Sequence, residues 1–304
     1  MKLRNQTYRH SSYSSFYITD PKVRHIHKAC VKDRLVHHAI YRILYSLFDK
    51  GFIPESYSCR VKKGTHKAVN QLEYLIKSVS QNQTKDCWAL KCDIKKFFAS
   101  VGHEILFNLV RRKIADEDVL SLIWEIISSF GQRGSRRSSN RESISTALDT
   151  RERERERESK KFRVAKTGLP IGNLTSQLFA NIYLNELDQL IKHKLKIKHY
   201  LRYCDDFVIL DNDPTNLLKI QDQIELFLNK RLKLGLHPNK VVICKLNQGI
   251  DFLGYVALPH YRTLRTKTKK RMLKRINDKN SSSYFGLLKH CNGYKLKNSL
   301  KNMD

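Results

Sequence analysis

The sequence predicts an α+β fold in which helices cover one face of a split βαβ sheet. Residues 88–93 and 200–210 are short apolar stretches with strand periodicity, and longer stretches with helical periodicity lie between and after them. The resulting order, β–α–α–β–β–α–β, is typical of a split βαβ arrangement. A chain of 304 residues is long enough to bury the core of such a fold.

The first helix is expected at residues 33–51, after a polar segment at residues 1–20 that shows no clear period. Asp33 is predicted to be the N-cap of this helix, and Gly51 is predicted to stop it. The apolar positions that define the helix are Val36, Ile40, Ile43, Leu44 and Leu47.

The next elements are a strand at 88–93 and a helix at 103–130 that is broken near Ala115. Between residue 131 and about residue 161 the sequence becomes rich in Ser and Arg, and Arg and Glu alternate through 151–158. We interpret this part as an inserted loop or solvated helix outside the core, with an RNA-binding arm as the functional alternative.

The second half of the chain supplies a long helix and a β-hairpin. A single apolar stripe predicts the helix through Phe179, Tyr183, Leu187, Ile191 and Leu195. Strands at 200–204 and 206–210 then meet at a hairpin tip, and a helix at 217–234 follows. Strands are expected at 241–244 and 252–255.

Two adjacent carboxylates, Asp205 and Asp206, lie at that hairpin tip. Most Asp-Asp pairs are turns or solvated caps, but apolar β-type residues flank this pair on both sides. Burying two carboxylates is costly unless a cation lies between them. Asp93 ends another strand, and it can converge with the pair if the strands are neighbours. Three carboxylates could then hold two magnesium ions about 4 Å apart and support phosphoryl transfer.

Composition favours a nucleic-acid partner. Lys and Arg total 58 against 29 Asp and Glu, which gives a formal charge of +29. No stretch is apolar enough for a membrane span and none resembles a signal peptide, so we expect a soluble intracellular protein. The seven cysteines lack metal-ligand spacing and are predicted to be free thiols. The histidine pairs at 25/27 and 37/38 are interpreted as phosphate contacts or surface residues.

Motifs in the chain resemble those of reverse transcriptases over nearly its whole length. Residues 92–98, Cys-Asp-Ile-Lys-Lys-Phe-Phe, resemble the first catalytic block, and residues 203–206, Tyr-Cys-Asp-Asp, resemble the YxDD box. The resemblance implies a right-hand polymerase with fingers at 1–90, a palm at 91–255 and a short basic thumb at 256–304. It implies that two Mg2+ ions, or Mn2+ as an alternative, bind Asp93, Asp205, Asp206 and the backbone carbonyl of Ile94.

The same resemblance assigns roles in substrate binding. Phe98 matches the residue that excludes a ribose 2′-hydroxyl. Lys22 and Arg24, with Arg34 as a further candidate, match basic residues near the triphosphate, and Lys240 lies in the segment near the pyrophosphate. The primer grip matches Phe252, Leu253, Gly254 and Tyr255. The implied partners are template RNA, a cDNA or DNA primer and deoxynucleoside triphosphates, with no membrane.

One block points to a subgroup. Residues 168–177 read Gly-Leu-Pro-Ile-Gly-Asn-Leu-Thr-Ser-Gln, whereas most reverse transcriptases have Gln-Gly in the middle and Ser-Pro at the end. Ile171, Gly172 and Gln177 therefore resemble the reverse transcriptases of diversity-generating retroelements, which make errors at template adenines. An Ile in place of an amide removes a hydrogen bond that would help fix the nucleotide. This likeness implies a bacterial or phage origin and a small basic helical-bundle accessory protein that forms a ring.

The C-terminal segment and two alternative functions complete the interpretation of the sequence. Only about 50 residues follow Tyr255, which suits a short thumb with a basic helix at 262–275 and no RNase H, maturase or endonuclease domain. The alternative enzyme is a retron-like or phage-defence reverse transcriptase. The alternative outside enzymes is an inactive RNA-binding scaffold.

Overall fold

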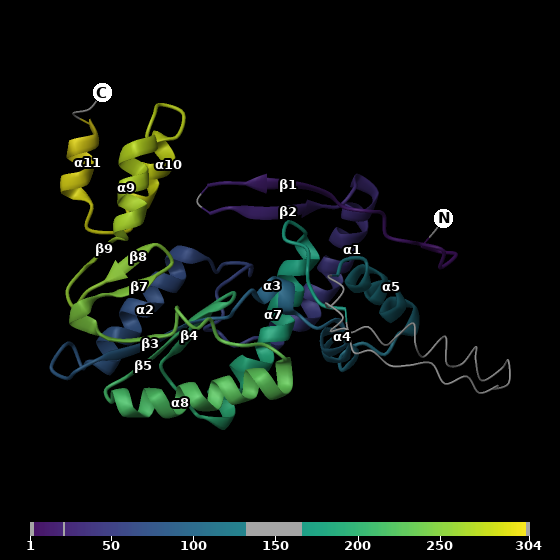
Figure 1. The fold of residues 1–304 in the computed structure, drawn as a ribbon, viewed down its shortest axis with the longest axis horizontal. Coiled ribbons are helices and arrows are strands. Elements are labelled where there is room, and N and C mark those ends of the chain that lie inside the picture. Colours follow the sequence, from purple (N-terminus) through teal and green to yellow (C-terminus); the bar gives the residue numbers. More distant parts are fainter. Residues whose placement is uncertain (1–2, 21, 132–165, 302–304) are drawn as a thin grey trace, which may run out of the picture. The chain divides into compact units, whose positions relative to one another are not determined.

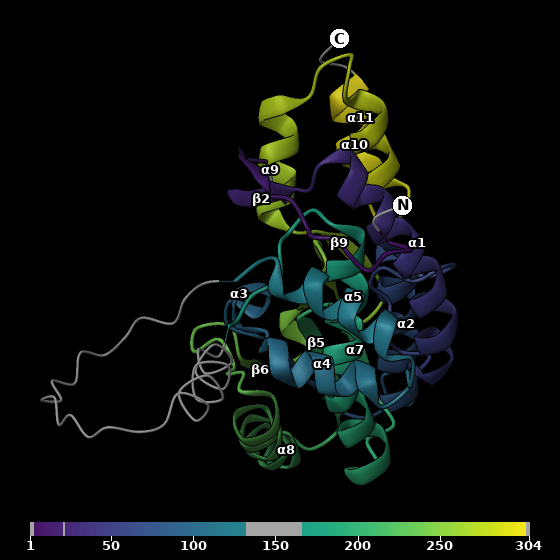
Figure 2. The same ribbon diagram turned by 90° about the vertical axis from the view of Figure 1, so that its right-hand side faces the viewer.

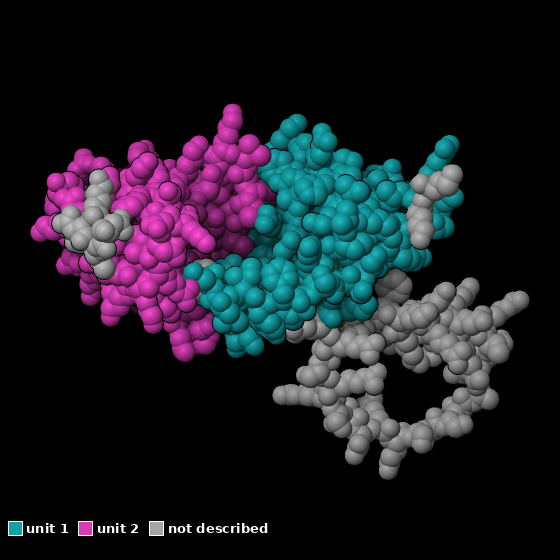
Figure 3. All heavy atoms as spheres, turned by 90° about the horizontal axis from the view of Figure 1, so that it is seen from above, with its two compact units in different colours: residues 1–51, 95–185, 229–234 teal, residues 52–94, 186–228, 235–304 magenta. Residues whose placement is uncertain are grey.

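A computed structural model of the chain describes residues 3–20, 22–131 and 166–301. The chain forms two compact units, which Figure 3 shows in different colours. Unit 1 comprises residues 1–51, 95–185 and 229–234, and unit 2 comprises residues 52–94, 186–228 and 235–304. The Ser/Arg-rich insertion expected at 131–161 lies outside the described residues except for Gly131.

Unit 1 is mainly helical and carries one β-hairpin (Figure 1). The expected 103–130 helix is divided into two helices, the first of which ends at Arg111. Asp116 caps the second, because its carboxylate accepts from the amides of Asp118 and Val119. The prediction of a broken helix is therefore confirmed. The elements of the unit are β1 Ser14–Ile18, β2 Arg24–Lys28, α1 Val31–Phe48, a 3-10 turn Asp49–Gly51, α3 Phe97–Ser100, α4 His103–Arg111, α5 Glu117–Ser128 and the first part of α7 Leu174–Gln189.

The hairpin was not expected from the sequence, and the start of α1 was predicted wrongly. All of β1 is exposed, so its sequence carries no alternation of buried and exposed residues that could indicate a strand. The N-cap of α1 is Cys30, and Asp33 lies in the first turn with its side chain buried. Asp33 is buried because it accepts hydrogen bonds from partners outside the helix.

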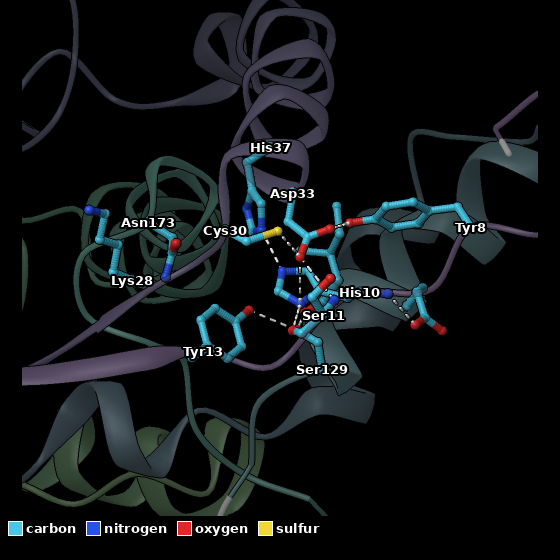
Figure 4. Close-up of polar contacts among 12 residues, drawn as sticks. Tyr8, His10, Ser11, Tyr13, Lys28, Cys30, Asp33, His37, Ser129 and Asn173 are labelled. Carbon is cyan, nitrogen blue, oxygen red and sulfur yellow. Dashed lines mark hydrogen bonds and ion pairs between the residues drawn. The ribbon is translucent and has the colours of Figure 1, made fainter. Parts of the chain in front are cut away.

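A buried polar network surrounds Asp33 (Figure 4). Its carboxylate accepts from the Tyr8 hydroxyl at 2.8 Å and from the Ser11 amide at 2.9 Å. Desolvation raises the pKa of Asp33, but hydrogen bonds from Cys30, Tyr8 and Ser11 outweigh it and lower the pKa to about 2. The interpretation of His37 as a surface residue is wrong, because His37 is buried beside this network.

Unit 2 contains the predicted split βαβ sheet (Figure 1). Its strands are β3 Trp88–Asp93, β4 Tyr200–Tyr203, β5 Asp206–Asp211 and β6 Val242–Lys245, in the order β4-β5-β3-β6. All neighbours are antiparallel, so β3 and β4 are parallel with β5 between them, and β5 and β6 are parallel with β3 between them. Each βαβ unit is therefore split by a strand of the other.

Helices lie on both faces of this sheet, and not on one face as expected. Helix α2 Thr65–Val79 joins a buried cluster with Ala89, Leu201 and Val208, which share one face because β-strand side chains alternate. Helix α8 Pro214–Phe227 lies against β3 and β5, and Figure 1 shows it on the opposite side from α2. The two faces explain why β5 is buried through its interior.

Helix α8 starts three residues earlier than expected because the Asp213 carboxylate caps it and Pro214 occupies its first turn. The helix continues as a π-helical turn at Leu228–Leu232. Helix α7 likewise continues as a π-helical turn at Leu190–Lys194. The buried stripe predicted for α7 is confirmed at its first four positions, since Leu195 is half-buried.

A second, three-stranded sheet and three helices complete unit 2 (Figures 1 and 2). The expected strand at 252–255 is instead a tight hairpin, because Leu253 and Gly254 turn the chain with φ of 51° and 91°. The expected basic helix at 262–275 begins only after a short strand. The elements are β7 Ile250–Phe252, β8 Tyr255–Ala257, β9 Arg262–Leu264, α9 Thr266–Arg275, α10 Ser281–Leu288 and α11 Tyr294–Lys301.

All seven cysteines are free, which confirms the prediction of free thiols. Within residues 3–20, 22–131 and 166–301, no helix is long and apolar enough to cross a membrane.

The Asp33 network gives a stability prediction. Because the folded pKa of Asp33 lies below the ordinary value of 3.8, its stabilisation is present above that pH and is lost as the pH falls toward 2. Asp33→Asn is expected to lower the free energy of unfolding at pH 7 by about 2 kcal/mol. In urea titrations the difference between the two proteins should shrink at about pH 3. A difference that stays constant with pH would contradict this account.

Candidate active site

The hairpin between β4 and β5 places two of the predicted catalytic residues. Cys204 and Asp205 form its two-residue turn, and Cys204 has a φ of 57°, which is uncommon for a residue with a side chain. Asp206 is the first residue of β5, and it lies directly opposite Asp93, the last residue of β3. The Ile94 amide donates to the Asp205 carbonyl at 3.2 Å. The structure therefore brings Asp93, Asp205 and Asp206 together at one end of the sheet, as the sequence predicted.

The two hairpin carboxylates are in an environment that disfavours their charge. The pKa of Asp206 is raised to about 6. Desolvation is the largest cause; the charge of Lys91 lowers the pKa, and the charges of Asp93 and Asp205 raise it. Desolvation also raises the pKa of Asp205. The Oδ1 atom of Asp206 is buried and has no hydrogen-bond partner among the described residues. This end of the sheet thus has excess negative charge and an open acceptor.

Asp93 has a cationic partner. The Lys240 ammonium lies 3.0 Å from both carboxylate oxygens of Asp93. The segment that carries Lys240 is tied to the same strand, because the His237 amide donates to the Asp93 carbonyl at 2.8 Å. Lys240, predicted as a nucleotide contact, is therefore placed beside the predicted catalytic carboxylates. Its side chain is 46% exposed, which leaves it accessible to an anionic ligand.

A buried ion pair contacts the hairpin that carries Asp205 and Asp206. Arg202, on β4, is fully buried, and its guanidinium donates to both carboxylate oxygens of Asp188 at 2.8 and 2.6 Å. The same guanidinium donates to the Cys204 carbonyl at 3.0 Å and to the Ser56 hydroxyl at 3.1 Å. It therefore fixes the turn that carries Asp205. Sequence reasoning missed this pair, although an Arg inside an apolar strand was a usable signal.

The residues fit a divalent metal by their chemistry. Carboxylate oxygens are the ligands that Mg2+ prefers, and the unpartnered Oδ1 of Asp206 is an acceptor without a donor. In the part of the chain that the structure describes, no three His, Cys, Asp or Glu side chains are gathered tightly enough to hold a metal. The ammonium of Lys240 contacts Asp93, so Asp93 has to exchange or share that partner when it binds a metal.

The residues predicted to form a primer grip belong to unit 2, where they make up the turn and flanking positions of the β7–β8 hairpin. Phe252 and Tyr255 are buried in the core cluster, and the Tyr255 hydroxyl bonds to the Leu287 carbonyl at 3.2 Å. The Gly254 carbonyl accepts from the Arg265 amide at 2.9 Å. Leu253 and Gly254 form the turn, so these two are the residues of the group that can meet a ligand.

Several other predicted nucleotide contacts belong to unit 1. Phe98 is half-buried in α3, and its carbonyl accepts from the Leu169 amide at 2.6 Å. Ile171 is half-buried and Gly172 is exposed, and both lie in the connection to α7. The Ile171 carbonyl accepts from the His27 amide on β2 at 2.8 Å. Unit 1 therefore joins the β1–β2 hairpin, α3 and the 168–177 block.

The basic candidates of unit 1 lie on two of its elements. Lys22 is in the turn of the β1–β2 hairpin and Arg24 is the first residue of β2, and both are exposed. Gln177, in the first turn of α7, lines a cavity of about 240 Å³ together with Arg34 and His38. The polar and cationic lining of this cavity comes from α1, from Asn173 in the connection before α7, and from α7 itself.

Comparison with known proteins identifies the family. Residues 19–257 match the sequence profile of the family described as reverse transcriptase (RNA-dependent DNA polymerase). The chain belongs to the reverse transcriptase family. The match includes Asp93, Asp205 and Asp206.

Relatives and solved structures agree with this assignment. Protein YkfC of Escherichia coli is 25% identical over 77% of this chain and 63% of its own length. The group II intron-encoded protein LtrA of Lactococcus lactis is 23% identical over 89% of this chain and 51% of its own length. The reverse transcriptase chain thus spans between half and two thirds of the length of these curated relatives.

The fold matches that of a structurally known polymerase. Apo telomerase from Candida tropicalis superposes with a TM-score of 0.54 at 9% identity, over 83% of this chain and 48% of that one. A form of the same protein truncated from its C-terminal domain gives a TM-score of 0.50 at 11% identity, over 84% of this chain and 55% of that one. The α+β right-hand polymerase fold class is confirmed.

The buried pair under the hairpin gives a second stability prediction. Asp188→Asn leaves the Arg202 guanidinium buried without a carboxylate, and it is expected to cost about 3–5 kcal/mol of unfolding free energy. Asp86→Asn is the control, because Asp86 pairs with Lys245 at an exposed position and its loss should cost less than about 1 kcal/mol. Urea unfolding of both variants would measure this. Equal losses of unfolding free energy in the two variants would show that the buried pair contributes no more to stability than the exposed pair.

Proposed function

We propose that this reverse transcriptase family member is an RNA-directed DNA polymerase that extends a primer by two-metal nucleotidyl transfer. The observation that carries the proposal is the pairing of Asp93 with Asp206 across β3 and β5, with Asp205 in the adjoining turn. The substrates would be template RNA, a cDNA or DNA primer and deoxynucleoside triphosphates. Family membership and the carboxylate geometry both support this proposal.

The carboxylates of Asp93, Asp205 and Asp206, with the Ile94 carbonyl, would hold the two Mg2+ ions. When bound, these ions would lower the pKa of the primer 3′-hydroxyl and offset charge on the triphosphate. Lys240 would add a further positive charge beside Asp93, where the phosphates of an incoming nucleotide need it. The hairpin turn would hold Asp205 in place through the Arg202 contact with the Cys204 carbonyl.

The residues of unit 1 would bind and select the nucleotide. Lys22 and Arg24 are exposed cations suited to triphosphate oxygens. Phe98 would exclude a ribose 2′-hydroxyl by its bulk. Ile171, which offers no side-chain hydrogen bond, would leave the nucleotide less firmly positioned than an amide does.

The finer proposal is that this polymerase belongs to the diversity-generating retroelement type. It rests on the block that contains Ile171, Gly172 and Gln177. Errors at template adenines, mutagenic retrohoming and a basic helical-bundle accessory protein are parts of this proposal. A retron-like enzyme would share the carboxylates without the altered block.

The catalytic proposal predicts that Asp206→Asn abolishes primer extension. The loss should be at least about a hundredfold, because an amide cannot supply the anionic oxygen that a metal requires. The assay contains purified protein, RNA template, primer, Mg2+ and deoxynucleotides, and Asp222→Asn on the exposed surface of α8 serves as control. Undiminished extension by Asp206→Asn, or no extension by the wild type, would remove the proposal and favour an inactive RNA-binding scaffold.

Lys240→Gln is expected to separate nucleotide binding from metal binding. The KM for deoxynucleotides should rise about tenfold, because a charge-assisted contact to phosphate is lost. The Mg2+ concentration for half-maximal activity should fall, because Asp93 no longer has a competing cation. Lys245→Gln, which removes an ammonium paired with Asp86, should leave both values unchanged. A rise in the Mg2+ requirement of Lys240→Gln would contradict the assigned role.

Sequencing of the extension products tests the mutagenic proposal. Misincorporation should be higher opposite template adenine than opposite the other bases, and Ile171→Gln should reduce it, since an amide restores a hydrogen-bonding group. Equal error rates opposite all four template bases would count against the retroelement subgroup and leave polymerase activity intact.

A further inference from the structure

The 168–177 block is held to β2 by hydrogen bonds that involve the residues before and after Gly172. The His27 amide donates to the Ile171 carbonyl at 2.8 Å, and the Asn173 side-chain amide donates to the His27 carbonyl at 2.9 Å. Asn173 is 4% exposed, so its side-chain amide depends on this bond more than on water. The block thus occupies the edge of β2 that β1 leaves free.

Gly172 lies between these two contacts and allows the close approach. Its φ is 115°, and a Cβ atom at this position would lie 2.7 Å from the Cγ2 atom of Ile26. Any larger residue would push the block away from β2. The glycine is therefore explained by packing within unit 1, whatever contact it makes with a nucleotide.

A third contact comes from α1, through a chain of side chains that Figure 4 shows in part. His37 Nδ1 lies 2.5 Å from the Thr175 hydroxyl, and its Nε2 lies 3.0 Å from Nε2 of His10. Nδ1 of His10 lies 2.6 Å from the Ser11 carbonyl, which can only accept. Desolvation, and then His10, lower the pKa of His37 to about 4, so its ring is neutral at pH 7.

The neutral His37 ring has one donor nitrogen and one acceptor nitrogen, so it donates in one of its two contacts and accepts in the other. His10 donates from Nδ1 to the Ser11 carbonyl, because a carbonyl oxygen can only accept. The Thr175 hydroxyl can donate or accept, and it bonds to His37 Nδ1 in either case. Thr175 and His37 are 1% and 2% exposed, so water cannot replace either partner. The chain ends at Ser11, whose amide is held by Asp33.

We propose that Asn173, Thr175 and His37 are positioning residues that hold the nucleotide-selecting block in register with β2 and α1, and so set nucleotide discrimination. This inference rests on the proposed polymerase function. Alternate residues of the block, at positions 171, 173 and 175, are each held by a partner outside it. The side chain of Ile171 is therefore kept in one place although it makes no polar contact itself. A displacement of about 1 Å at such a group is enough to alter reactivity.

The decisive variants are Thr175→Val, which keeps the shape and removes the hydroxyl, and Asn173→Ala. Steady-state incorporation of single correct and incorrect nucleotides should show a KM for the correct one raised about fivefold to tenfold and a reduced discrimination ratio, with kcat within about twofold. Thr175→Ser keeps the hydroxyl and should restore both values. Ser129→Ala is the matched control, because it removes a hydroxyl bonded to Tyr13 that does not touch the block.

Hydrogen–deuterium exchange of residues 168–177 supplies a readout that is independent of activity. The block amides should exchange faster in Thr175→Val and Asn173→Ala than in wild type or Ser129→Ala, while the β3 and β5 amides stay unchanged. Unchanged exchange in the block would overturn the inference, even for an inactive protein. Faster exchange with unaltered KM and discrimination would also overturn it. Lack of extension by the wild type would instead remove the proposed function.

Discussion

The antiparallel pairing of β3 with β5 is the constraint on which the candidate active site depends. It sets Asp206 opposite Asp93, and it forces the chain to turn at Cys204 and Asp205. The same pairing removes water from the carboxylates, which raises the pKa of Asp206 and leaves one of its oxygens without a donor. Cations are needed to stabilise the ionised form of carboxylates held in this way. Lys240 supplies one positive charge beside Asp93, and bound metal ions would supply more.

Two buried polar networks hold the functional segments of this chain. In unit 2, the buried pair of Arg202 and Asp188 fixes the turn formed by Cys204 and Asp205. In unit 1, Asp33 and His37 organise the N-terminal segment and the start of α7. Both networks are costly to bury and more costly to break, because removal of one member leaves its partner desolvated. Such networks favour a single arrangement of the backbone that they support.

The differences between expectation and structure have local causes. Strands β1 and β2 were not predicted from the sequence, because β1 is exposed throughout and so has no buried apolar face. Asp33 resembled an N-cap because Asp is favoured there, but it accepts from Tyr8 and Ser11, whose proximity depends on the fold. The 252–255 segment resembled one strand because Phe and Tyr favour strands, whereas Leu253 and Gly254 adopt positive φ. Only for Asp33 did contacts distant in sequence outweigh the local preference; the other two differences come from exposure and from turn conformation.

Apolar periodicity and adjacent carboxylates in a strand are local signals, so the sequence alone indicated the α+β class and the three candidate aspartates, and its motifs indicated the reverse transcriptase family by resemblance. Phe98, Ile171 and Gln177 were also named from the sequence, as motif positions whose roles remain proposals. Only the tertiary structure decided that Lys240 pairs with Asp93, that Arg202 fixes the hairpin and that Thr175 meets His37. These contacts join residues on different elements, and no short-range pattern encodes the packing that brings them together.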